Sequence, residues 1–199
     1  MKENVWTNQR SPLVDGLEIV GLHQESHGVE VSGTMQAILS RLTVRRAQDG
    51  IRLEQRNRNV IISECHVYQN RGAGILLDQL NLHQVNITNC HVSYNGGGGI
   101  VVRRSEIRNL QIAACDIEGN MDAEGSPTAN VLIDTREGSV REGALIGCTI
   151  QHTHDAKDSA NVRFLGRSSE EPQKVGHFAI ADNAMSDVAV NIHLRHARG

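Results

Sequence analysis

The sequence predicts an all-β chain that coils into a solenoid of short parallel strands. Three observations carry this prediction: a repeat of 25 residues, apolar residues that alternate with period two, and the lack of a sustained helical period. The stretch NVIISECHVYQNRGAGILL (59–77) matches QVNITNCHVSYNGGGGIVV (84–102) 25 residues later. The same frame continues less closely at 16–22, 41–47, 110–120, 144–152 and 178–187.

Each repeat unit predicts two strands and two turns. An apolar-x-apolar strand leads to a turn that carries Cys or Asn and then to a short apolar segment, after which a glycine-rich turn precedes the next strand. Parallel strands usually need helical crossovers, but a coil that returns to the start of the next coil needs none. The strands after the glycine turn are expected at 28–31, 50–53, 74–77, 99–102, 130–133, 161–164 and 189–192.

The units together predict one domain, residues 15–199, preceded by an irregular segment, residues 1–14. About seven coils fit between Asp15 and the C-terminus. Three longer loops are expected, at 119–129, 152–160 and 165–177. Long loops that flank one face of a solenoid are where such proteins build binding walls.

The repeat N-V-x-I-x-x-C-x-V-x-x-N-x-G-x-G-I-x-I resembles that of the right-handed parallel β-helix in the pectate-lyase-like superfamily. The resemblance covers residues from about 15 to 193 and is closest over 59–133. A rival interpretation is a leucine-rich repeat, because L-x-x-V-x-I-x-x-C-x-V occurs at 82–92. Leucine-rich repeats place a helix or irregular segment after the strand, whereas here glycine runs oppose a helix. The sequence therefore favours the β-helix.

Composition limits the function classes. The net charge of −3 and the aromatic content of 3% argue against a nucleic-acid partner. No membrane span and no signal peptide are expected, so the chain as written reads as soluble, although a removed leader or upstream domain stays open and the compartment unknown. No cofactor is expected, since no phosphate-binding glycine motif lies between a strand and a helix. Poorly covered ends leave end-to-end self-association as a further partner hypothesis.

Four cysteines are expected to form one internal column: Cys65, Cys90, Cys115 and Cys148, continued by Asn183. Their wide spacing is unlike the short pairs of zinc sites, and stacked neighbours point the same way, which opposes disulfides. Buried free thiols are the expected outcome. His66 and His91 should stack outward one coil apart, and no metal site is predicted from them.

The superfamily resemblance implies that the outer face of the strand after the glycine turn forms the floor of a cleft. By alternation, one outward row reads Ser32, Glu54, Asp78, Arg103, Asp134, Leu165 and His193. Asp78, Asp134, Glu54 and Arg103 are therefore the candidate catalytic residues. Arg52, Arg163, His154 and Asp155 are candidate substrate-binding residues near the row and its loops.

Two hypotheses about this row remain open. Carboxylates two coils apart suit glycoside hydrolysis, and a base beside an arginine suits a lyase or epimerase that acts on a uronate. The chain would then bind or process a polysaccharide. The alternative is a non-catalytic structural or binding module, either alone or as a fragment of a larger protein, in which alternating charges satisfy one another and keep the face hydrated. The shortness of the chain favours the module.

Overall fold

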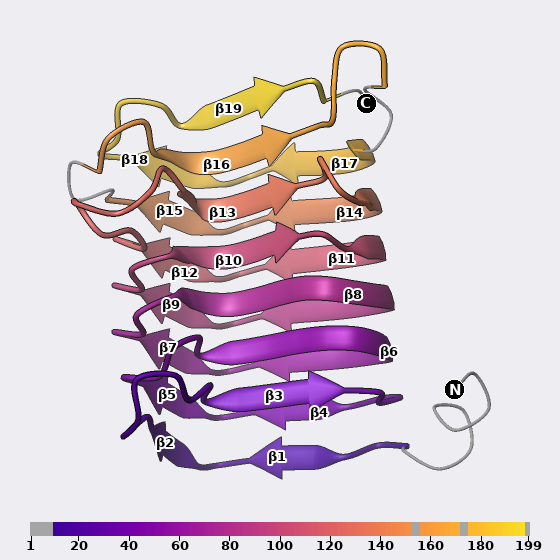
Figure 1. The fold of residues 1–199 in the computed structure, drawn as a ribbon, viewed down its shortest axis with the longest axis vertical. Helices are drawn as coiled ribbons and strands as arrows, with labels where there is room; N and C mark the ends of the chain where they lie inside the picture. The colour runs from indigo at the N-terminus through magenta and orange to yellow at the C-terminus, as the bar shows by residue number, and fades with distance from the viewer. Residues whose placement is uncertain (1–9, 153–155, 172–174, 198–199) are drawn as a thin grey trace.

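The computed structural model describes residues 10–152, 156–171 and 175–197. These residues form strands and turns, and none of them forms a helix. The described part of the chain therefore holds no helix that could span a membrane. Neighbouring strands run parallel, and the chain rises coil by coil from the N-terminal to the C-terminal end (Figure 1). Each coil contributes a strand to each of three faces, which corrects the predicted two strands per unit, because the short apolar segment after the cysteine forms a strand of its own.

The first face is built from the strands that follow the glycine turn: β3 (Val29–Ser32), the start of β6 (Ile51–Ser63), the start of β8 (Ala73–Thr88), β10 (Gly98–Arg103), β13 (Ala129–Asp134), β16 (Ala160–Leu165) and β19 (Ile192–Arg195). The second face comprises β1 (Leu13–Asp15), β4 (Ile38–Ser40), the later parts of β6 and β8, β11 (Glu106–Ala113), β14 (Ser139–Ile146) and β17 (Val175–Ala181). The third face comprises β2 (Glu18–Val20), β5 (Thr43–Arg45), β7 (His66–Tyr68), β9 (His91–Ser93), β12 (Asp116–Glu118), β15 (Thr149–Gln151) and β18 (Ala184–Ser186).

The third face is a separate sheet of seven strands, one from each coil, which confirms the predicted coil number. The first and second faces belong to one sheet because β6 and β8 run around the corner between them. The register shifts between Leu53 and Gln55 at this corner, where Gln55 and Gln79 adopt positive φ. A bulge of this kind bends a strand and lets it serve two faces.

Inward side chains from all three faces form one continuous core along the stack. Ile75, Leu77 and Val67 are completely buried, and so are their counterparts one coil on, as the alternation predicts. Each such aliphatic side chain contributes about 1.5–3 kcal/mol when fully buried. Where a leucine-rich repeat would have a helix, this chain forms the first part of β8 and, one coil on, β10.

The cysteine column lies inside this core. All four thiols are free and at most 3% exposed, as predicted. Asn183 continues the column, since its Oδ1 accepts a hydrogen bond from the Cys148 amide at 2.9 Å. Hydrogen bonding to the Cys115 and Cys65 thiols, together with burial, raises the pKa of Cys90, and contact with Cys115 followed by burial raises that of Cys148.

A second internal ladder, made of asparagines, was not predicted from the sequence. It lies where each coil turns from the third face into the first. The side-chain amide of each member donates to the carbonyl of the next at 2.8–3.0 Å, in the order Asn70, Asn95, Asn120, Asn130, Asn161 and Asn191. Buried polar groups that are fully hydrogen bonded fix the register of neighbouring coils.

Glycine is required beside this ladder. A Cβ on Gly99 would lie 2.4 Å from the Asn130 carbonyl oxygen, and one on Gly50 would lie 2.6 Å from the Gly74 oxygen. Coils therefore approach here more closely than any side chain allows. In the first four coils this glycine (Gly28, Gly50, Gly74 or Gly99) is a packing requirement as well as a turn signal, whereas asparagines hold the equivalent place in the last three.

The last coil corrects the predicted register. The sequence placed Val190 opposite Val162, but Ile192 is the partner of Val162, a shift of two residues. The cause is Asn191, which takes the ladder position beside Asn161. The outward row consequently ends with Arg195 rather than His193, and His193 pairs in register with Arg163.

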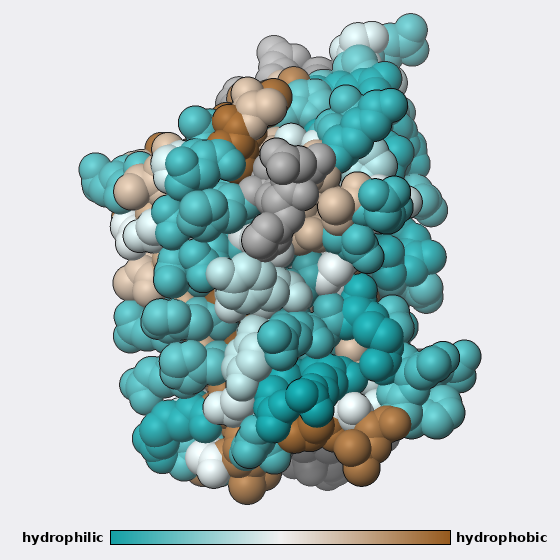
Figure 2. Space-filling model, turned by 90° about the vertical axis from the view of Figure 1, so that its left-hand side faces the viewer, coloured by the Kyte–Doolittle hydropathy of each residue, from teal (hydrophilic) through white to brown (hydrophobic). Residues whose placement is uncertain are grey.

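Large exposed hydrophobic side chains concentrate in the first and last coils. Leu13, Leu17 and Leu22 are exposed at one end and Val190, Ile192 and Leu194 at the other, whereas Ile61, Tyr94 and Ile146 are exposed between them. Figure 2 shows a mostly hydrophilic side, on which hydrophobic surface gathers toward the two ends. End-to-end association stays a prediction. The first strand begins at Leu13, two residues before the expected start of the domain.

Candidate functional site

The predicted row of charges forms on the outer side of the first face. Asp78, Arg103 and Asp134 lie on consecutive strands β8, β10 and β13 and are paired in register. Asp78 is 1% exposed and receives hydrogen bonds from two arginines, from Arg103 Nε at 3.1 Å and from Arg104 Nε at 2.8 Å. Burial acts to raise the pKa of Asp78, but the hydrogen bond from Arg104 and the charges of both arginines outweigh it and lower the pKa.

The other acids of the row are also paired with arginines. Asp134 binds the guanidinium of Arg136 two residues along, with Nη2 2.6 Å from Oδ2. Glu54 binds Arg52 at 3.0 Å, and Arg52 also contacts the His27 ring. Each predicted catalytic carboxylate is therefore paired with a guanidinium.

The middle of the first face is apolar on its outer side. Leu76 and Val101 point away from the core, yet they are at most 3% exposed. They form a small separate cluster with Ala73, against which Leu132 packs. This cluster separates the charge pair of Arg52 and Glu54 from the C-terminal coils.

A cavity of about 820 Å³ opens at the C-terminal end of the same face. Its lining residues come from the loop before β16, from β16 itself, from the segment between β18 and β19, and from β19: Ala156, Lys157, Asp158, Ser159, Arg163, Asp187, Val188, Ala189, Val190 and His193. Residues 156–159, from the longer loop expected at 152–160, line one wall.

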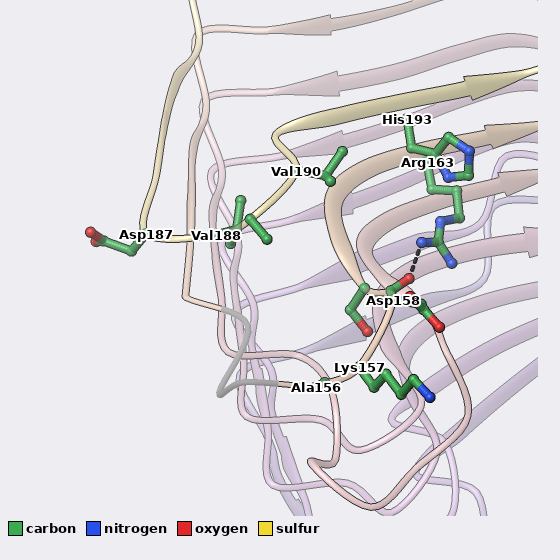
Figure 3. Close-up of a pocket in the computed structure, with 10 residues that line it drawn as sticks. Ala156, Lys157, Asp158, Arg163, Asp187, Val188, Val190 and His193 are labelled. Carbon is green, nitrogen blue, oxygen red and sulfur yellow. Dashed lines mark hydrogen bonds between the residues drawn. The ribbon is translucent and has the colours of Figure 1, made fainter.

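Arg163 and His193 project side by side into this cavity from adjacent strands, whereas Asp187 lies on the far side (Figure 3). An Nη2 hydrogen of Arg163 is donated to the backbone carbonyl of Asp158. The Nε of Arg163 is buried and finds no hydrogen-bond partner among the described residues. Burial lowers the pKa of Arg163. An arginine guanidinium nevertheless stays charged at the pH values at which proteins are folded.

Sequence reasoning found part of this cavity. Arg163 and the long loop were predicted, but Lys157 and the apolar stretch Val188–Val190 were not. The missed stretch lies in the coil whose register was wrong, and its apolar pattern was interpreted as a strand. His154 and Asp155, the predicted rim residues, lie outside the described residues. Their neighbour His152 approaches Asp187, with Nδ1 3.7 Å from Oδ2.

The outward histidines stack as expected on the third face. The His66 and His91 rings lie 4.9 Å apart, and His91 Nδ1 is 3.7 Å from Asp116 Oδ2. Within the described residues, no group of three His, Cys, Asp or Glu side chains has the arrangement of a metal site.

Comparison with known proteins defines the family. The model of the right-handed β-helix region matches residues 5–140, which is more than half of the chain. No curated protein and no solved structure matches the chain. The repeat, the three parallel faces and this match agree, and the chain belongs to the right-handed β-helix family.

Proposed function

We propose that the protein binds an acidic polysaccharide and that the C-terminal cavity holds a carboxylate-bearing sugar unit. The observation that carries this proposal is the pair of Arg163 and His193, which project from adjacent strands into the cavity. The planar guanidinium of an arginine pairs with a carboxylate through two parallel hydrogen bonds. The buried Nε of Arg163 is a donor that such a carboxylate would satisfy.

The remainder of the cavity suits a sugar ring. Val188, Ala189 and Val190 supply an apolar surface on which the C–H face of a ring can pack. Lys157 adds a second cation, and the backbone and the Ser159 hydroxyl supply groups that pair with sugar hydroxyls. A concave site with apolar walls and a few converging polar groups is the usual form of a ligand site.

A catalytic role for the row of Asp78, Arg103, Asp134 and Glu54 is the second candidate function. The alternation of acid, arginine and acid on three consecutive strands favours it. Reaction would require substrate to displace an arginine from a carboxylate, because the acids are paired in the free protein. Binding without turnover needs no such displacement, so we place it first.

Binding is tested by calorimetric titration with oligogalacturonate and with its methyl ester, which lacks the charge. Arg163→Gln should weaken binding of the acid form by at least about tenfold, since a charge-assisted pair is lost. Arg167→Gln is the matched control, because Arg167 pairs with Glu171 outside the cavity. Equal binding of the acid and the ester, or full binding by Arg163→Gln, would overturn the assignment to the cavity.

Turnover is tested on the same ligands and on alginate, by following unsaturated products and reducing ends. Activity that disappears in an Asp78→Asn, Asp134→Asn double variant, with its fold retained by circular dichroism, would support the catalytic row. If neither binding nor turnover is detected across this panel, the result would favour a structural module.

A further inference from the structure

Four arginines gather on the outer side of the second face, on strands that do not line the cavity of the first face. Arg58, His83, Arg108 and Arg141 are partners in register on β6, β8, β11 and β14. Because each coil adds about 4.8 Å, this column spans roughly 14 Å along the solenoid. Arg56 lies two residues before Arg58 on the same outward side. We call these five residues the arginine patch.

The arginine patch is only partly neutralised. Arg108 pairs with Glu142 at 3.3 Å, but both side chains are 46% exposed, and exposed pairs of this kind contribute little. Glu106, an acid on the same strand two residues before Arg108, accepts a hydrogen bond from the Ser139 hydroxyl. No acid pairs with Arg56 or Arg141 within the described part of the chain.

Arg58 is buried without an anionic partner, and two other patch arginines each bury one donor atom. Arg58 is only 8% exposed, and its hydrogen bonds go to the Asn57 carbonyl at 3.4 Å and to Asn81 Oδ1 at 3.3 Å. The Nε atoms of Arg56 and Arg141 are buried, and neither has a hydrogen-bond partner among the residues described. Donors of this kind are costly to bury unless something accepts their hydrogen bonds.

The patch is electropositive enough to affect its own histidine. Burial, followed by the charges of Arg58 and Arg108, lowers the pKa of His83. Burial and the charge of Arg56 likewise lower the pKa of Arg58. Like charges placed opposite each other in neighbouring strands destabilise a sheet. The fold therefore carries a local repulsion that a bound anion would relieve.

A shallow depression of about 180 Å³ marks where such an anion would sit. Its lining includes His83, Arg108 and Arg141, together with Asn81, Glu106, Ile107 and Ser139. We propose that the arginine patch binds the repeating oxyanion groups, carboxylate or sulfate, of a linear acidic polysaccharide. Arginines on three of four successive coils suit a polymer that lies along the solenoid axis, and guanidinium groups pair with both oxyanions through two hydrogen bonds.

The same features favour a polysaccharide over a single-stranded nucleic acid. Sequence-tolerant nucleic-acid sites combine basic grooves with aromatic rings on which bases stack. No Phe, Tyr or Trp is among the residues that line this depression, and the chain contains 3% aromatics in all. This inference does not depend on the cavity of the first face, since the two sites share no residue.

The test compares two double variants that remove the same charge. Arg56→Gln with Arg141→Gln removes the two patch arginines that have no acid partner. Arg45→Gln with Arg167→Gln removes two arginines elsewhere, which pair with Glu18 and Glu171. Both variants and the unaltered protein are titrated with dextran sulfate, polygalacturonate, uncharged dextran and a single-stranded oligonucleotide, after circular dichroism has established that they are folded.

We expect the patch variant to bind one or both acidic polysaccharides at least about tenfold more weakly, with a smaller salt dependence, since charge-assisted contacts are lost. The control variant should bind about as well as the unaltered protein. Dextran sulfate and polygalacturonate distinguish sulfate from carboxylate as the preferred group. If the patch variant should fail to fold, Arg56→Lys with Arg141→Lys keeps the charge but loses the planar fork, and weaker binding is again expected.

Three results would overturn the proposal. One is equal binding by the patch and control variants. Another is tighter binding of the oligonucleotide than of either polysaccharide. The third is loss of polysaccharide binding in Arg163→Gln but not in the patch variant, which would support the cavity and eliminate the patch. Conversely, loss in the patch variant alone would support the patch and leave the cavity without its proposed ligand.

Discussion

Removing one amide from the middle of the asparagine ladder should strongly destabilise the protein. Asn95 is completely buried and makes four side-chain hydrogen bonds. Its Nδ2 donates to Val67 O at 3.0 Å and to Asn120 Oδ1 at 2.8 Å, and its Oδ1 accepts from the backbone and side-chain nitrogens of Asn70 at 3.1 and 2.8 Å. Asn95→Ala deletes all four bonds.

The expected loss follows from those contacts. At about 1 kcal/mol net for each hydrogen bond, Asn95→Ala should lower the free energy of unfolding by about 4 kcal/mol. Asn191→Ala is the matched control, because Asn191 is exposed at the end of the same ladder and accepts one bond, from Asn161 at 2.8 Å. That substitution should lower the free energy of unfolding by about 1 kcal/mol.

Urea unfolding followed by far-ultraviolet circular dichroism measures both values. The two variants should differ by about 3 kcal/mol at the same slope against urea. Equal losses in the two variants would refute the reasoning, because they would mean that buried and exposed ladder positions contribute alike.

Three further predictions concern packing, pH and thiol reactivity. Gly99→Ala should lower the free energy of unfolding by about 2 kcal/mol or more, since its Cβ would lie 2.4 Å from the Asn130 carbonyl oxygen; a thermal melt close to that of the unaltered protein would contradict the close approach. The lowered pKa of Asp78 means that its pairs with Arg103 and Arg104 add stability that is fully present above the unfolded pKa of about 4 and is lost as the pH falls through the lower folded value. Asp78→Asn should therefore be less stable than the unaltered protein in urea at pH 7, with the gap closing in strong acid; a gap that stays constant with pH would argue against the ion pairs. The four buried thiols should react with a thiol reagent only after unfolding in urea, and rapid reaction of the native protein would show that the core opens locally.

The sequence alone determined the architecture because each repeat of the sequence corresponds to one coil of the structure. Residues that stack in neighbouring coils occupy equivalent places in the repeat, so matching 59–77 to 84–102 was enough to align Cys65 with Cys90 and Ile75 with Ile100. Period-two alternation then separated inward from outward side chains. These rules are local, and the predicted alignment of first-face strands held across coils of different length and failed only in the last coil.

Only the tertiary structure decided the partners of the charged side chains and the register of the last coil. The sequence placed Asp78 on an outward row, but its burial and its pairing with Arg104, which lies at the corner beyond β10, depend on how that corner folds back. In the last coil, hydrogen bonding between Asn161 and Asn191 outweighed the apolar pattern and shifted the strand by two residues. That shift brought His193 beside Arg163 in the cavity. Sequence alone could not place this pair, because the order of residues along a chain does not specify which long side chains converge across neighbouring coils.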